Sequence, residues 1–123
     1  MKILASICIG LIAALHLYIA WFEMFAWTSR GPAVFSSFPA ELFEPTTMMA
    51  ANQGLYNSFL AAGLIWSLFI KDPIWQRRVA TCFLLFVAMA GLFGAYTVSP
   101  RIALVQSVPA VIALVLLWLG RGR

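Results

Sequence analysis

The chain has 123 residues, of which 63% are hydrophobic and only 10% are charged. Soluble domains average about 45–50% apolar and about 25% charged residues, and a globule of this size exposes too much surface to be covered by so few charges. Disordered chains are polar and rich in charge, so disorder is excluded as well. The composition therefore predicts an integral membrane protein, with residues 1–123 forming a single membrane domain.

The net charge is +4, from eight Lys and Arg against four Asp and Glu. These cations stand at the ends of apolar runs, which is typical of charges that orient a chain in a bilayer. The sequence has no basic stripe with interleaved aromatic residues, so we expect no nucleic-acid partner. Cys8 and Cys82 lie inside apolar runs without metal-ligand spacing, and we predict that both are small buried residues.

Four segments are long and apolar enough to cross a bilayer, whose core of about 30 Å needs roughly 20 helical residues. They cover residues 3–26, 46–70, 79–98 and 102–119. Pro45 is predicted at the first helical position of the second span, where its missing N–H has no partner to lose. The first span alone resembles a cleaved signal peptide, but its length and the three later spans favour a retained helix. The predicted fold is an all-α membrane protein, a four-transmembrane-helix up-down bundle.

The flanking cations are distributed unequally if all four helices cross the membrane. One side carries Lys2, Lys71, Arg77, Arg78, Arg121 and Arg123, and the other carries Arg30 and Arg101. The positive-inside rule then predicts that both termini are cytoplasmic. Trp27 is expected at the outer interface, and Trp75 and Trp118 at the inner one, as in the aromatic belts of membrane proteins.

The long connection at residues 28–44 is predicted to lie outside. It contains Val34, Phe35, Phe38, Leu42 and Phe43, which is more apolar and aromatic than a loop surrounded by water. Two interpretations stay open. The segment is a lid or short helix at the outer membrane surface, or it is an irregular loop with a few side chains dipping into the membrane.

His16 and Glu23 are the two ionisable residues within the predicted spans. Such residues are costly in a membrane and are functional candidates by default. They are separated by two helical turns, so they share one face of the helix, with Glu23 about 10 Å nearer the outer end.

Most other polar side chains of the spans also fall in the outer half, and the inner half contributes only Ser6, Cys8, Ser67, Thr81 and Cys82. Asn52, Gln53, Tyr56 and Asn57 come early in the second span, Tyr96 ends the third, and Gln106 begins the fourth. A carboxamide that faces lipid loses hydrogen bonds at a cost of several kcal/mol. We therefore predict one shared ligand or proton site lined by His16, Glu23, Asn52, Gln53, Tyr56, Asn57, Tyr96 and Gln106. The alternative is a polar staple, in which interhelical hydrogen bonds worth roughly 0.6 kcal/mol each hold the helices together.

Two further features concern helix packing. Pro109 lies inside the fourth span and leaves the carbonyl of Val105 without its helical donor, which either opens a kink beside Gln106 or is an ordinary membrane-helix proline. The third span carries small residues four apart, Ala90 with Gly94 and Gly91 with Ala95. They permit close helix approach, and packing within one chain is favoured over dimerisation.

The strings His16–Trp27, Asn52–Asn57, Gly91–Thr97 and Gln106–Ala110 resemble a small bacterial four-helix membrane family catalogued as a domain of unknown function. The most specific string is Asn-Gln-Gly-Leu-Tyr-Asn at residues 52–57. The resemblance implies four spans in the bacterial inner membrane and a signature made of the polar residues. Ser58 and Ser107 stand where the family pattern leads us to expect glycine, and the resemblance implies no established activity.

Three functions remain open at this point. In the first, the chain is a binding or transport protein, in which Glu23 exchanges a proton or binds a small cationic amphipathic or lipid-like ligand in an outward-facing pocket. Small multidrug exporters have a similar size and a lone carboxylate in the first span, but their charge bias is weaker and their carboxylate lies deeper. In the second, the chain is a structural or partner-binding membrane subunit, including a homo-oligomer. In the third, His16 and Glu23 act as acid and base on a lipid-like substrate, although no reaction-specific motif is present. We expect no cofactor and no metal.

Overall fold

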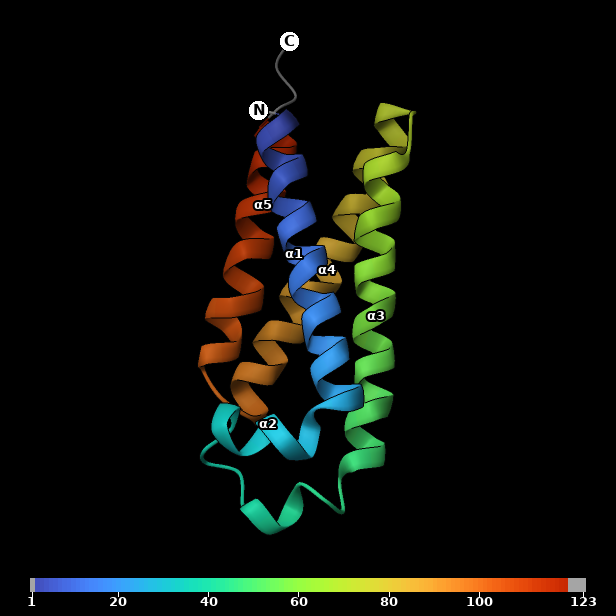
Figure 1. Ribbon diagram of the computed structural model, residues 1–123. Coiled ribbons are helices and arrows are strands. Elements are labelled where there is room, and N and C mark those ends of the chain that lie inside the picture. Colours follow the sequence, from blue (N-terminus) through green and yellow to red (C-terminus); the bar gives the residue numbers. More distant parts are fainter. Residues whose placement is uncertain (1, 120–123) are drawn as a thin grey trace. The chain divides into compact units, whose positions relative to one another are not determined.

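The computed structural model describes residues 2–119, and all regular structure in this range is helical (Figure 1). The α-helices are α1 (Lys2–Phe25), α2 (Trp27–Val34), α3 (Thr47–Phe69), α4 (Pro73–Thr97) and α5 (Val108–Leu119). A 3-10 turn, η1 (Ala40–Leu42), and a π-helical turn, η2 (Ala103–Ser107), complete the set. The all-α prediction is therefore confirmed for residues 2–119, while Arg121 and Arg123 lie outside the described residues.

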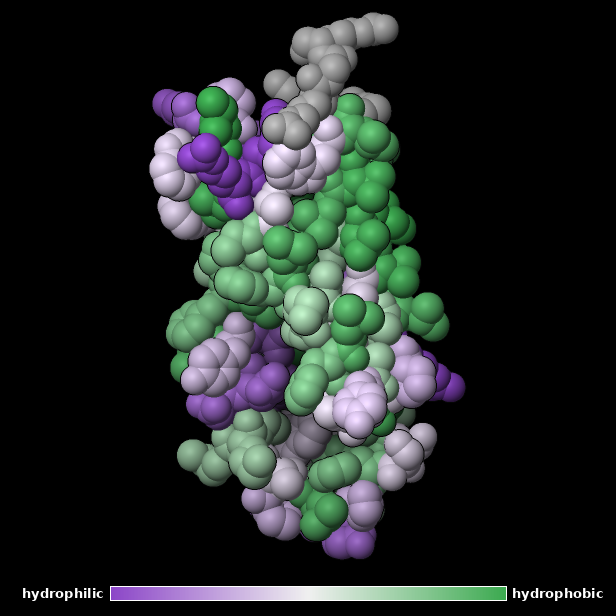
Figure 2. Space-filling model, turned by 180° about the vertical axis from the view of Figure 1, so that it is seen from behind, coloured by the Kyte–Doolittle hydropathy of each residue, from purple (hydrophilic) through white to green (hydrophobic). Residues whose placement is uncertain are grey.

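Two described helices are long and apolar enough to cross a membrane, at Ile3–Phe25 and Pro73–Thr97, and the apolar segment Ala103–Leu119 is shorter. Helix α3 has 23 residues, but the carboxamides of its first half lower its hydropathy. Hydrophobic residues cover much of the surface visible in Figure 2, interrupted by several separate hydrophilic patches. Exposed apolar surface on this scale is unusual for a soluble monomer, and with the two apolar helices it suggests a membrane protein.

The chain forms two compact units, and the boundary between them falls within α1 and within α3. The larger unit consists of residues 1–14 and 60–123, and the smaller unit consists of residues 15–59. Four helices contribute to the core of the larger unit: α1, α3, α4 and α5. Its buried residues are Ile9, Ile12, Ala13, Leu64, Ala80, Leu84, Val87, Ala88, Ala110 and Ala113.

The buried side of α4 follows helical periodicity. Ala80, Leu84, Val87 and Gly91 are buried at spacings of three and four residues, so they form one stripe along the helix. Cys82 lies off this stripe and is exposed. The prediction of a buried Cys82 is therefore wrong, because an apolar sequence run does not identify the side of the helix that faces the protein.

Small residues allow α4 and the chain after it to pack closely in the larger unit. A Cβ on Gly91 would meet the hydroxyl of Ser107, and a Cβ on Gly94 would lie 2.9 Å from Cγ2 of Ile102. Ser107 donates a hydrogen bond from its hydroxyl to the carbonyl oxygen of Ala88 at 2.8 Å. Gly91 and Gly94 therefore pack within one chain, whereas Ala90 of the same stripe is exposed. The serine at 107 has a bonding role that glycine could not fill.

The last predicted span is not a uniform α-helix. Residues Ala103–Ser107 form a π-helical turn, in which the N–H of Val108 bonds to the carbonyl of Ala103. Pro109 follows directly and has no N–H to donate, so the regular hydrogen-bond pattern is interrupted at this point. Single π turns inside α-helices are a known response to such interruptions.

Two helix starts differ from expectation. Helix α4 begins at Pro73 rather than near residue 79, because the carboxylate of Asp72 accepts hydrogen bonds from the N–H groups of Ile74 and Trp75 at 2.9 and 2.8 Å. An Asp cap followed by proline is a favourable helix start. Helix α3 begins at Thr47, so Pro45 lies in the preceding turn instead of at the first helical position.

Candidate functional site

The smaller unit joins Glu23 of α1 to Asn57 of α3. The side-chain amide of Asn57 donates to Oε2 of Glu23 at 2.7 Å and to the backbone carbonyl of Gln53 at 3.3 Å. The first distance is at the short end of N–H···O bonds and is typical of a carboxylate acceptor. Asn57 is buried, with 9% of its surface exposed, whereas Glu23 is half-buried.

Gly54 brings the two helices close enough for this bond. A Cβ at residue 54 would lie 2.6 Å from Cγ of Met24, 2.9 Å from the carbonyl oxygen of Ala20 and 3.2 Å from Cβ of Glu23. Gly54 is one turn before Asn57 on the same face of α3. The absence of a side chain at 54 therefore sets the helix separation at which Asn57 reaches Glu23.

His16 lies two turns before Glu23 on α1 and is fully buried. The sequence placed it on the same helical face as Glu23, and both side chains do point at least partly into the protein. A fully enclosed imidazole has no surface open to a substrate or to lipid.

The remaining predicted residues of α3 lie on its exposed side. Asn52, Gln53 and Tyr56 are all exposed, and Gln53 contributes to the pair only through its backbone carbonyl. The buried positions in this half of α3 are 50, 54 and 57, which follow helical spacing. Residues 52, 53 and 56 fall between them, so their side chains project away from the buried stripe.

Tyr96 and Gln106 belong to the larger unit. Tyr96, near the end of α4, has 89% of its surface exposed. Gln106 lies in η2 and is half-buried, and its Cβ would be 2.9 Å from a Cβ placed on Gly91. Among the described residues, a hydrogen bond between side chains connects two of the eight predicted site residues, and it joins Asn57 to Glu23.

The connection between α1 and α3 folds onto an aromatic cluster formed by Phe22, Trp27, Phe35, Phe38 and Phe43. The ring centroids of Trp27 and Phe43 are 5.1 Å apart, and those of Phe38 and Phe43 are 5.0 Å apart. Phe43 has only 2% of its surface exposed. Such aromatic contacts add about 0.5–1.5 kcal/mol per pair beyond area burial, so this segment is an ordered structure with a core of its own.

Two details hold this aromatic cluster in place. The indole N–H of Trp27 donates to the hydroxyl of Thr46 at 3.0 Å, which links the start of α2 to the start of α3. Gly31 of α2 lies against the ring of Phe43, where a Cβ would clash. The segment 28–44 thus contains most of a short helix and a 3-10 turn, so it is not an irregular loop, while its place at the outer membrane surface stays a prediction. Sequence reasoning identified its aromatic residues but not their joint packing around Trp27.

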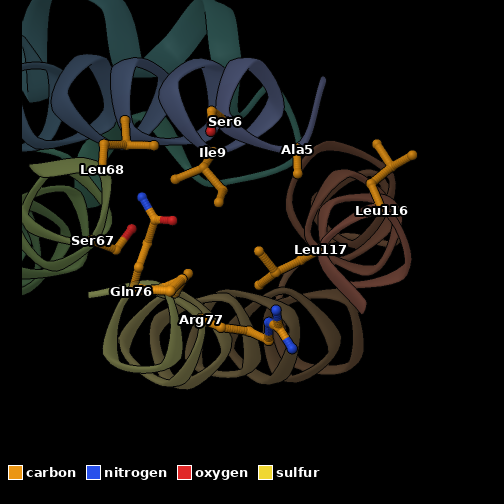
Figure 3. Close-up of a pocket in the computed structure, with 11 residues that line it drawn as sticks. Ala5, Ser6, Ile9, Ser67, Leu68, Gln76, Arg77, Leu116 and Leu117 are labelled. Carbon is orange, nitrogen blue, oxygen red and sulfur yellow. The ribbon is translucent and has the colours of Figure 1, made fainter. Parts of the chain in front are cut away.

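A small cavity lies in the larger unit, away from the residues that the sequence singled out. Figure 3 shows the Gln76 carboxamide and the Ser67 hydroxyl directed into it, with Ile9, Leu68 and Leu117 around them. Its volume of about 40 Å³ suits roughly one water molecule and is too small for an amphipathic ligand. Gln76 lies between the second and third predicted spans, so the sequence pattern did not single it out.

Comparisons with known proteins agree with one another. A family model described as "Protein of unknown function (DUF1304)" matches residues 10–118. The chain is similar to "Uncharacterized protein YpaA" of Lactococcus lactis subsp. lactis (strain IL1403), with 29% identity over 117 residues that cover 94% of this chain and 97% of that protein. No solved structure matches.

Proposed function

We propose a binding function for this chain, which belongs to the DUF1304 family. In this proposal it is a four-span membrane protein that binds a small cationic amphipathic molecule at Glu23. A proton is the competing occupant. One observation carries the proposal. Asn57 holds one oxygen of the Glu23 carboxyl group, and no residue within 2–119 donates a hydrogen bond to the other oxygen.

A carboxylate accepts several hydrogen bonds through its two oxygens. At Glu23 one oxygen is fixed by Asn57, which orients the group, while the half-buried side chain stays accessible. An interhelical staple needs only neutral carboxamides, and a carboxyl group within an apolar helix carries a desolvation cost. A half-bonded, oriented carboxyl group therefore supports the binding of a cation or a proton.

The neighbouring residues suit the apolar part of such a ligand. Tyr56 precedes Asn57 and contacts Phe59 edge-on at 6.1 Å. Aromatic faces attract organic cations as well as apolar groups, so the exposed rings of Tyr56 and Phe59 support an amphipathic cation over an inorganic one.

The proposed topology keeps both termini in the cytoplasm of a bacterial inner membrane. The six-to-two cation bias and the two long apolar helices support it, with α3 and residues 103–119 as the remaining spans. Glu23 then lies toward the outer face, and α2 with η1 lies along the outer membrane surface. We also propose that the string at residues 52–57 is a signature of the family, because it supplies both Gly54 and Asn57.

A structural role is the second candidate, because the Glu23–Asn57 bond joins two helices and one partner is buried. An enzymatic role is not taken further. A general acid or base must reach its substrate, and His16 is fully enclosed.

The test measures thermal unfolding of the purified protein with and without tetraphenylphosphonium, a cationic amphiphile. Glu23→Gln keeps an oxygen that accepts from Asn57 but removes the negative charge. Glu44→Gln is the matched control, since Glu44 is an exposed carboxylate of the same unit. We expect the ligand to stabilise the wild type and Glu44→Gln but not Glu23→Gln.

Equal stabilisation of all three proteins would remove Glu23 from the binding role. The structural candidate makes a different prediction for Asn57→Ala: a lower unfolding temperature with an unchanged response to the ligand. A loss of the ligand response in Asn57→Ala favours the binding role instead.

A further inference from the structure

A group of charged and aromatic side chains lies in the larger unit, where α4 begins and α5 ends. The guanidinium of Arg77 lies 5.8 Å from the ring centroid of Trp118, and that of Arg78 lies 5.5 Å from the ring centroid of Trp75. The indole N–H of Trp118 donates to the hydroxyl of Thr81 at 3.1 Å. This bond fixes the end of α5 beside the first turns of α4, so the two arginines and the two tryptophans form one basic–aromatic patch.

No carboxylate among the described residues neutralises the positive charge of this patch. Within residues 2–119 neither guanidinium forms an ion pair with a carboxylate, and each lies over an indole ring instead. The nearby carboxylate of Asp72 is engaged by the N–H groups of Ile74 and Trp75. Lys71, which is exposed, adds a third cation.

The patch also has a recess and apolar borders. Ile74, Arg77, Arg78 and Trp118 line a groove of about 330 Å³, a volume within the usual range of about 300–1,000 Å³ for small-molecule sites. Ile74 and Trp75 are exposed beside the guanidinium groups. An occupant of this groove therefore meets positive charge and exposed apolar surface together.

We propose that Arg77 and Arg78, framed by Trp75 and Trp118, bind the phosphate headgroup of an anionic phospholipid. The planar guanidinium fork matches two phosphate oxygens at once. Basic pockets between helices at the cytoplasmic side of a membrane suit anionic headgroups, and tryptophan is enriched at that depth. The apolar border favours a lipid over a free anion, because an acyl chain extends the contact beyond the phosphate. This site needs the chain to lie in a bilayer, but it does not need Glu23 to bind a ligand.

The experiment titrates the purified protein in neutral detergent with dioleoylphosphatidylglycerol, and separately with dioleoylphosphatidylcholine and with inorganic phosphate. Tryptophan fluorescence and the unfolding temperature report binding. The test variant is Arg77→Gln with Arg78→Gln. The control, Arg30→Gln with Arg101→Gln, removes the same charge from positions outside the patch.

We expect phosphatidylglycerol to bind the wild type and the control at least about tenfold more tightly than the test variant, with a weaker response to phosphatidylcholine. A variant with Arg77→Lys and Arg78→Lys keeps the charge without the planar fork, and it should bind several-fold more weakly than the wild type. This milder change decides the matter if the glutamine variant does not fold.

Three results would overturn the proposal. The first is an equal loss of affinity in the test and control variants, which would indicate general surface charge. The second is an equal response to inorganic phosphate, which would indicate a site for free anions. The third is a doubling of the particle mass on lipid addition in the wild type but not in the test variant, which would assign the patch to contact between two copies of the chain.

Discussion

The close approach of α1 and α3 at Gly54 makes a quantitative prediction for Gly54→Ala. A methyl group there would lie 2.9 Å from the backbone carbonyl oxygen of Ala20, which cannot rotate away, and 2.6 Å from the more adaptable Met24 side chain. Overpacking of this kind costs about 1–3 kcal/mol. Alanine gains about 1 kcal/mol over glycine in helix propensity, so the net loss is expected at about 0–2 kcal/mol.

Gly10→Ala provides the matched control, because a Cβ at Gly10 of α1 meets only Cδ1 of Leu68, at an ordinary contact distance of 4.0 Å. This substitution should therefore stabilise the protein by up to about 1 kcal/mol. The quantity to measure is the difference between the two free energies of unfolding, followed by circular dichroism in detergent. The steric cost predicts that Gly54→Ala is less stable than Gly10→Ala by about 1–3 kcal/mol. Equal stabilisation by both substitutions would show that Gly54 does not set the helix separation.

Three further substitutions test other contacts. Asp72→Ala removes the N-cap of α4 and should lower the free energy of unfolding by about 0.5–2 kcal/mol, with a small loss of helical ellipticity. An unchanged stability would show that the cap does not stabilise the helix. Ser107→Ala removes the hydrogen bond from the hydroxyl to the Ala88 carbonyl and should lower the free energy of unfolding by about 0.6–1.7 kcal/mol. The same unfolding assay measures it, and a gain in stability would show that the bond contributes nothing. Trp27→Phe keeps an aromatic ring in the cluster but loses the bond to Thr46. It should make residues 28–44 more susceptible to limited proteolysis without shifting the main unfolding transition, and unchanged cleavage would refute the role of that bond.

The sequence predicted the Glu23–Asn57 contact only in part. Composition and hydropathy establish how far along a helix each polar residue lies, and this was enough to place Glu23 and Asn57 at related depths. Depth does not determine which way a side chain points around the helix axis. That direction depends on the partner face, and at α3 it is set by the buried positions 50, 54 and 57, which only the packed structure reveals.

The other departures have similar physical origins. The Asp72–Pro73 start of α4 is a local capping signal. The charges of Arg77 and Arg78 predict a membrane boundary after them, but a helix can begin before the membrane does. The aromatic residues of the segment 28–44 were noted, but their cluster depends on Gly31 leaving room for Phe43. A contact between residues far apart in the chain has no local pattern that would predict it.

The exposed carboxamides of α3 are explained by their depth under the proposed four-span topology. Helix α3 begins at Thr47, so at about 1.5 Å per residue Asn52 lies about 8 Å and Asn57 about 15 Å from its outer end. The headgroup regions of a bilayer extend several ångströms on each side of its apolar core. Asn52 and Gln53 are therefore shallow enough to bond to headgroups and water, whereas Asn57 lies where a bare amide would lose its hydrogen bonds. This is the position at which the chain supplies an internal partner, the Glu23 carboxyl group.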